Sequence, residues 1–243
     1  MSVFPTPMSI AVIVPLLNEI AALPELVEHL RSFDFEQILF VDGGSSDGSW
    51  QWLQQHVPQQ SIQVEAGRSR QMNAGAVQAT AGLLLFLHAD TRLPSNALKE
   101  IHDGLKPIVS NISSPRDKEK VWGRFNVVFD TFDWRMRLIA FFINKRSAWT
   151  GIATGDQAIF VRRDIFERLQ GYADIGLMED IDLSKRLKHY SRPFCSHHCV
   201  TTSARRWQNK GVLKTVLQMW SLRLAYFLGF NPDRLARFYR QSR

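Results

Sequence analysis

The sequence predicts an α/β fold with a mostly parallel central sheet flanked by helices. Short apolar runs such as 37–41 alternate with stretches whose apolar residues recur at helical spacing. Three of these runs end in turn-forming or acidic residues, as at Asp42 and Asp90. Alternating strands and helices favour a parallel sheet with right-handed crossovers, and ligands bind outside the carboxyl ends of such strands. We therefore expect a ligand site at this edge of the sheet.

Four strand–helix units are predicted in the first half of the chain. We expect strands near 10–14, 37–41, 62–65 and 83–87, and helices near 22–31, 49–56, 69–80 and 94–105. The polar segment 107–120 predicts a mobile surface loop. This loop separates a first half, about 8–106, from a second half, about 121–207.

The second half has a less regular order. Its expected elements are a strand (121–128), a helix (131–143), a loop (144–154), a strand (156–161), a helix (179–189) and a strand through 195–199. The last strand contains Cys195, His197 and Cys199, a spacing that suggests zinc. We reject a zinc site because no second ligand pair accompanies it elsewhere in the sequence.

Composition is compatible with one domain and an appendage. A chain of 243 residues that is 45% hydrophobic can bury the core of one α/β domain (1–207), followed by a helical extension (208–243). The first eight residues lack the basic region and long apolar stretch of a secretory signal. Two cysteines are too few for a disulfide framework and fit a reducing environment. We therefore expect a cytoplasmic protein.

The extension carries the positive charge of the chain. Residues 205–243 hold nine Lys or Arg and one acid, Asp233, whereas the preceding 204 residues hold 21 basic and 22 acidic residues. Such a segment suits nucleotide phosphates, anionic lipid or nucleic acid, and the alternative is a solvated helical face. The apolar run 211–230 predicts an interfacial helix or one packed on the domain. Because Arg223 lies on its apolar side, we expect that side chain to reach inward to a phosphate or an acid.

Three motifs carry a family resemblance. Ile13-Val14-Pro15-Leu16-Leu17-Asn18-Glu19, Val41-Asp42-Gly43-Gly44-Ser45-Ser46-Asp47-Gly48 and His88-Ala89-Asp90 occur in the order and spacing found in family 2 glycosyltransferases with the GT-A fold. The resemblance covers roughly residues 8–205. It implies a nucleotide-diphospho-sugar transferase with a donor half and an acceptor half. The expected reaction is an inverting transfer of a sugar from a nucleotide-diphosphate donor to an acceptor hydroxyl, with no nucleic-acid partner.

Two other function classes have specific requirements. A sugar-phosphate nucleotidyltransferase normally has an early Gly-rich loop with Arg and Lys, whereas the first lysine here is Lys99. A non-catalytic sugar-nucleotide binding protein has no need of an acceptor-side base. A dinucleotide-dependent oxidoreductase requires a Gly-rich fingerprint after the first strand, and residues 15–20 contain no glycine.

The first two motifs predict donor contacts. Asp42 is placed to accept a hydrogen bond from the ring N–H of the nucleobase, and Glu19 to bind the ribose. Pro15, Leu17 and Ala89 are expected beside the donor. The alternative is that Glu19 and Asp42 are only capping and turn residues.

The third motif occupies the position of the family's Asp-x-Asp metal site. Residues one apart on an extended segment point the same way, so His88 and Asp90 can face one metal ion. Carboxylate oxygen suits Mg²⁺ or Mn²⁺ bridging a diphosphate. Because His88 replaces the first acid, Asp90 is the principal expected ligand. The alternatives for His88 are a ribose contact or a core histidine.

Basic residues complete the expected donor site. Arg68 and Arg70 open a predicted helix, where positive charge is unfavourable, and binding to a phosphate or the donor sugar would explain them. The alternative is a surface ion pair. Asn73 belongs to a similar family pattern that shapes the donor pocket. Arg205 and Arg206 are expected phosphate ligands, and the missing glutamine of the Gln-x-x-Arg-Trp motif argues against polymer synthesis.

Two segments resemble the acceptor side of the family. Gly155, Asp156 and Gln157 are expected to bind the acceptor. In the Glu179-Asp180 pair, the resemblance implies that Asp180 is the catalytic base and that Glu179 orients the acceptor or a loop.

At finer grain the chain resembles a bacterial subgroup associated with selenodomain and arsenosugar-biosynthesis genes. The resemblance lies in 87–91, 155–160 and 202–207. It implies a small-molecule or lipid-linked acceptor. Together with the basic extension, it predicts peripheral contact with an anionic membrane surface on the cytoplasmic side.

Overall fold

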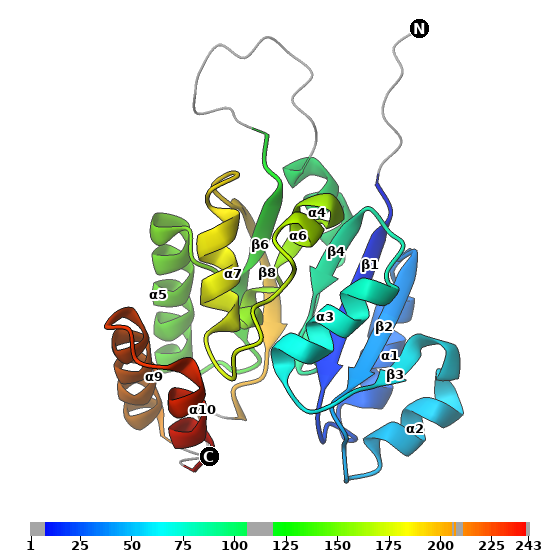
Figure 1. The fold of residues 1–243 in the computed structure, drawn as a ribbon, viewed down its shortest axis with the longest axis horizontal. Helices are drawn as coiled ribbons and strands as arrows, with labels where there is room; N and C mark the ends of the chain where they lie inside the picture. The colour runs from blue at the N-terminus through cyan, green and yellow to red at the C-terminus, as the bar shows by residue number, and fades with distance from the viewer. Residues whose placement is uncertain (1–7, 106–118, 206, 208–210, 242–243) are drawn as a thin grey trace, which may run out of the picture.

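The computed structural model describes residues 8–105, 119–205, 207 and 211–241 (Figure 1). Arg206 and most of the predicted loop 107–120 lie outside the described residues.

An eight-stranded sheet forms the centre of the described structure, in the order β3-β2-β1-β4-β7-β6-β8-β5. The strands are β1 (Ile10–Leu16), β2 (Gln37–Asp42), β3 (Ser61–Gln63), β4 (Leu83–Phe86), β5 (Thr91–Arg92), β6 (Trp122–Phe129), β7 (Phe160–Arg162) and β8 (Phe194–Thr202). β1 pairs in parallel with β2 and β4, and β6 pairs in parallel with β8. β7 runs antiparallel to both β4 and β6, and β5 antiparallel to β8. The prediction of a mostly parallel sheet is therefore confirmed.

Helices cover both faces of the sheet (Figure 1). The helices of the described residues are α1 (Leu23–Arg31), α2 (Ser49–His56), α3 (Arg68–Gln78), α4 (Ala97–Gly104), α5 (Trp134–Thr150), α6 (Arg163–Arg168), α7 (Glu179–Leu187), α9 (Val212–Phe227) and α10 (Pro232–Gln241). Alternation along β1 divides the core: Val12 and Val14 pack with α1, α2 and α4, whereas Ala11 and Ile13 pack with α3, α6 and α7. The near-continuous apolar sequence of β1 follows from this burial on two faces.

The expected helix 131–143 and loop 144–154 are corrected by the structure. Helix α5 continues to Thr150 and ends at Gly151, whose φ of 67° is left-handed. Asn144, a polar residue that suggests a helix end, instead anchors the helix to β6. Its Oδ1 accepts from Val127 N (2.9 Å), and its Nδ2 donates to Val127 O (3.0 Å).

The expected strand 156–161 is also displaced. A 3-10 turn, Gly155–Gln157, comes first, and β7 begins only at Phe160. The turn forms because Thr154 and Gln157 make a capping box. A short helix that was not predicted, α6, then follows β7.

The C-terminal helices pack back on the body of the protein. Leu222 of α9 and Leu235 of α10 share a buried cluster with Ile152, Met178 and Ile181. Asp233 Oδ1 accepts a hydrogen bond from the N–H of Gly176 (3.0 Å). Residues 152 and 178–181 are thereby covered by the C-terminal helices.

Candidate active site

The loops after β1 and β2 are locked together at the carboxyl edge of the sheet. Asn18 N–H donates to Ser45 Oγ (2.8 Å), and Ser46 N–H donates to Asn18 Oδ1 (2.8 Å). This exchange holds Asn18 in a left-handed conformation with φ of 56°. Ile20 N–H donates to Asp47 Oδ2 (3.0 Å), which extends the connection. The edge of the predicted site is therefore a rigid polar frame.

Asp42 lies at the base of this frame and is fully buried. Its Oδ2 accepts from Gly44 N (2.9 Å), Ser45 N (3.0 Å) and Gln63 Nε2 (2.8 Å). Within the chain, Asp42 therefore makes the contacts expected of a turn residue. The structure also places its carboxylate at the carboxyl end of β2, as predicted.

Around the frame, Glu19 meets the end of β8. Arg205 Nη2 lies 3.5 Å from Glu19 Oε2, and both side chains are partly exposed. Leu17 is 44% exposed beside them, whereas Pro15 is buried inside β1. Residues from opposite ends of the sequence therefore share one surface, as the donor hypothesis requires.

His88 follows β4 and points toward the acceptor half. Its Nε2 is buried and has no hydrogen-bond partner. A methyl group at position 155 would lie 2.4 Å from that atom, so only glycine leaves room for the ring. Burial, and then the positive charge of Arg68, lower the pKa of His88 to about 4. The ring is consequently a neutral group at pH 7.

Asp90 is the carboxylate at this position, and Ala89 before it is buried. The Asp90 Oδ1 accepts from Thr91 Oγ1 at 3.4 Å. Within the described ranges, no three His, Cys, Asp or Glu side chains gather as a metal cluster. A hard carboxylate oxygen with an unpartnered imidazole nitrogen nearby fits a divalent ion that takes its remaining ligands from a diphosphate.

Asp180 at the start of α7 is joined to the Gly155 turn. Its Oδ2 accepts from Gly155 N (2.9 Å) and its Oδ1 from Ile181 N (2.7 Å). Gly155 therefore contacts His88 on one side and Asp180 on the other. Asp156 is partly exposed in the same turn, whereas the side chain of Gln157 is buried and serves the cap of the turn. The expected donor and acceptor sides thus meet at one glycine.

Glu179 is buried, and Asp180 beside it is half-buried. Burial, and then the charge of Asp180, raise the pKa of Glu179 to about 7, although Arg68 opposes this with its Nη1 at 3.8 Å from Glu179 Oε1. Burial also raises the pKa of Asp180, against the Gly155 hydrogen bond. The pair therefore holds a proton near neutral pH, and its titration belongs to both carboxyls together. A general base is most effective when its pKa is close to the working pH.

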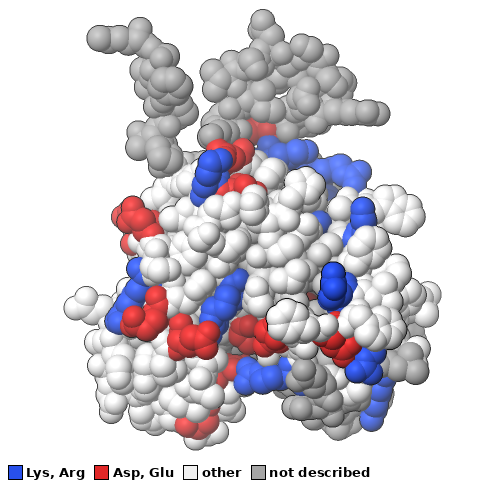
Figure 2. Space-filling model, turned by 180° about the vertical axis from the view of Figure 1, so that it is seen from behind, with Lys and Arg blue, Asp and Glu red and all other residues white. Residues whose placement is uncertain are grey.

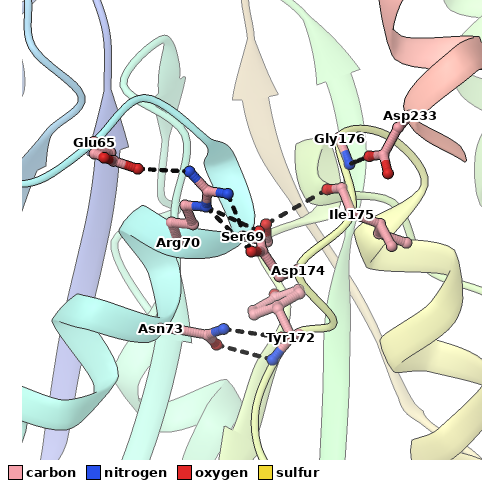
Figure 3. Close-up of polar contacts among 9 residues, drawn as sticks. All are labelled: Glu65, Ser69, Arg70, Asn73, Tyr172, Asp174, Ile175, Gly176 and Asp233. Atoms are coloured by element: carbon pink, nitrogen blue, oxygen red, sulfur yellow. Dashed lines mark hydrogen bonds and ion pairs between the residues drawn. The ribbon is translucent and has the colours of Figure 1, made fainter.

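Arg70 and Asn73 of α3 connect to the loop before α7 (Figure 3). Arg70 pairs with Glu65 (2.7 Å) and Asp174 (3.0 Å) at the surface, which is the ion-pair alternative. Asn73 Nδ2 donates to Tyr172 O, and its Oδ1 accepts from Tyr172 N, each at 2.8 Å. Both side chains therefore hold the loop that leads to Glu179, and the sequence did not suggest this role.

Two arginines near Asp180 complete the site. Arg146 of α5 has a buried Nη2 without a hydrogen-bond partner, and Arg223 of α9 has a buried Nε in the same condition. Both act electrostatically on Asp180. The expectation that Arg223 reaches inward agrees with this position. Arg146 was not predicted as a site residue, because it lies in the segment expected to be a loop.

Comparisons with known proteins agree with this fold. A family model described as "Glycosyl transferase family 2" matches residues 11–170. No curated protein matches the chain. The solved mannosyltransferase PcManGT from Pyrobaculum calidifontis, in complex with GDP-Man and Mn²⁺, is similar with a TM-score of 0.60 and 19% identity over 91% of this chain. TarS 1-349 from S. aureus, in complex with UDP-GlcNAc, gives a TM-score of 0.59 and 15% identity over 81% of this chain. The matches span 62% and 58% of those two proteins.

Proposed function

Because the chain belongs to glycosyl transferase family 2, we propose that it transfers a sugar from a nucleoside-diphosphate donor to an acceptor hydroxyl with inversion at C1. One observation carries the proposal: Gly155 contacts His88 on the expected donor side and hydrogen-bonds Asp180 on the expected acceptor side. The residues that we propose as base and metal ligand therefore lie on the two sides of one turn.

In the proposed step the acceptor oxygen attacks C1 from the face opposite the diphosphate. The new C1–O bond forms as the bond from C1 to the diphosphate oxygen breaks. Asp180 takes the proton of the acceptor hydroxyl, and the nucleoside diphosphate leaves with the electron pair of the broken bond. Glu179 supports this role, because its neighbouring carboxyl raises the proton affinity of the pair.

The donor is held by the frame after β1 and β2. Leu17 and Glu19 border it, Asp42 fixes its shape, and Arg68 and Arg205 supply positive charge near the diphosphate. When bound, Mg²⁺ or Mn²⁺ neutralises charge on the departing diphosphate, with Asp90 as its protein ligand and His88 beside it. PcManGT was solved with GDP-Man and Mn²⁺, which supports the choice of donor class and metal. The finer resemblance to the arsenosugar subgroup stays a prediction.

The proposal is tested by donor binding and by product stereochemistry. Thermal shifts with a panel of UDP- and GDP-sugars, with and without Mn²⁺, should identify a donor, and Asp42→Ala should weaken its binding at least ten-fold. Asp34→Ala is the matched control, because Asp34 is exposed just before β2, at the opposite edge of the sheet. Transfer should release nucleoside diphosphate and invert the anomer seen by NMR. Pyrophosphate release would indicate a nucleotidyltransferase, and binding without turnover a binding protein.

We also propose that the protein contacts an anionic membrane surface through α5 and α9. Large side chains on these helices are between 52% and 84% exposed: Trp134, Phe141, Phe142 and Trp149 on α5, and Leu217, Trp220, Leu224 and Phe227 on α9. Exposed cations accompany them at Lys145, Lys214, Arg234 and Arg237. Figure 2 shows Lys and Arg among uncharged surface on this side, at the right of the view. In the described part of the chain, no helix is long and apolar enough to cross a bilayer.

The energetics favour reversible binding. Each basic residue near an anionic surface contributes about 1 kcal/mol, and buried aromatic area adds to this. Flotation with phosphatidylserine vesicles should capture the protein at low salt, and Phe141→Ser with Trp220→Ser should abolish capture. Val77→Ser on α3, which removes a side chain that is 78% exposed, is the control. Capture that is equal in all three proteins would contradict this proposal.

A further inference from the structure

The two arginines near Asp180 have hydrogen-bond donors that their surroundings leave unsatisfied. Arg146 Nη1 donates to Ile152 O at 3.4 Å, but Arg146 Nη2 and Arg223 Nε are buried without partners. Asp156 and Asp180 act on Arg146 electrostatically, but among the described residues no carboxylate forms an ion pair with either guanidinium. Unsatisfied buried donors are costly, so their presence beside the proposed catalytic site calls for a ligand.

The arginines also repel each other. Burial, and then the positive charge of Arg223, lower the pKa of Arg146 to about 10. Their helices are held in place: Leu222, next to Arg223, packs in the cluster with Ile152 and Ile181. Two like charges on packed helices therefore repel each other, and a dianionic ligand would relieve that repulsion.

We propose that Arg146 and Arg223 bind a phosphate group carried by the acceptor, an inference that rests on the proposed function. Guanidinium forks match phosphate oxygens, and two cations match the charge of about −1.5 to −2 on a phosphate monoester. The site lies on the acceptor side because Arg146 hydrogen-bonds Ile152, three residues before Gly155, and Leu222, next to Arg223, packs on Ile181, next to Asp180.

The phosphate has two possible sources, which share this chemistry. A soluble phosphorylated acceptor would bring only the anion. A lipid phosphate would also bring a chain, and α5 and α9, which carry the two arginines, expose the aromatic side chains Phe141 and Trp220. Phosphate probes with and without an alkyl chain distinguish these two sources.

The test is calorimetry on the full-length protein, with the donor site filled by the nucleoside diphosphate and Mn²⁺. The probes are inorganic phosphate, decyl phosphate and decanol. Phosphate binding should weaken at least ten-fold, or 1.4 kcal/mol, in both Arg146→Gln and Arg223→Gln. Arg135→Gln, on the same helix as Arg146 but 57% exposed and paired with Asp133, should bind like the wild type. Arg223→Lys should recover part of the loss, because it restores the charge without the fork.

The melting temperature of each variant is measured alongside, and Arg223→Lys, which keeps the positive charge near Asp180, separates loss of the phosphate site from loss of folding. Decyl phosphate binding more tightly than inorganic phosphate assigns the site to a lipid phosphate, and equal binding assigns it to a soluble one. Wild-type affinity in both glutamine variants, or decanol binding as tightly as decyl phosphate, would overturn the inference. Nucleotide affinity is measured separately in the same protein: its absence would refute the proposed function, whereas intact nucleotide binding without phosphate binding would refute this site alone.

Discussion

Gly155→Ala should uncouple the two sides of the site by a single methyl group. The new Cβ would lie 2.4 Å from His88 Nε2 and 2.6 Å from His88 Cε1. Ordinary contacts between carbon atoms are about 3.5–4.0 Å, so the overlap is roughly 1 Å. The backbone at position 155 is not left-handed, and alanine therefore adds no conformational strain of its own. Overpacking of this kind costs about 1–3 kcal/mol.

A double-mutant cycle isolates this clash. Urea unfolding would be measured for the wild type, Gly155→Ala, His88→Ala and the double variant. Because His88→Ala removes the ring, Gly155→Ala should cost about 1–3 kcal/mol in the wild type and less than about 0.5 kcal/mol in the His88→Ala background. Turnover should fall in Gly155→Ala, since a shift of the turn lengthens the bond from Gly155 N to Asp180 Oδ2. The same destabilisation in both backgrounds would refute the packing of Gly155 on His88.

Four further predictions concern the surrounding acids and Asn73. Because the pKa of Glu179 rises from 4.5 to about 7 on folding, the stability of the wild type should fall as pH rises through that window. Relative to the wild type, Glu179→Gln should therefore be more stable by up to about 3 kcal/mol at pH 8 and equally stable near pH 4. A stability gain in urea unfolding that does not depend on pH would contradict the assignment. The rate of sugar transfer should rise with pH as one carboxyl of the Glu179–Asp180 pair ionises. A rate that does not change with pH would show that neither residue is the base. Asp90→Ala should abolish stimulation by Mn²⁺, so full stimulation would remove Asp90 from the metal site. Asn73→Ala should lower stability by about 1–3 kcal/mol, because Tyr172 loses two hydrogen bonds; an unchanged melting temperature would argue against that contact.

The first half of the chain, about 8–106, was predictable because its signals are local. The apolar run of β2 ends at Asp42 and a turn cluster follows, so strand, loop and edge position all come from adjacent residues. A parallel sheet then places the ends of β1, β2 and β4 at one edge. For the same reason His88 and Asp90 could be located without any knowledge of their neighbours.

The structure of the second half, about 121–207, depends on distant contacts that no local pattern contains. Helix α5 extends through Asn144 because that side chain bonds the backbone of Val127 on another element. Arg146 joins the site only because this extension exists. Asn73 looked like a donor ligand from its motif, yet it binds a backbone segment 99 residues away. Burial of Glu179 likewise depends on packing between separate segments.

The most direct test of the central claim is the rate of nucleoside diphosphate release from the sugar nucleotide in the wild type and in Asp180→Asn. Asparagine keeps the size of the side chain and an oxygen that can accept from Gly155 N–H, but it cannot take a proton. We predict that release falls at least 100-fold, in line with the contribution of a general base, which is about 10²–10⁴-fold. Donor affinity should change less than two-fold. Equal rates of release from wild type and Asp180→Asn, at equal donor occupancy, would contradict the assignment of Asp180 as the catalytic base.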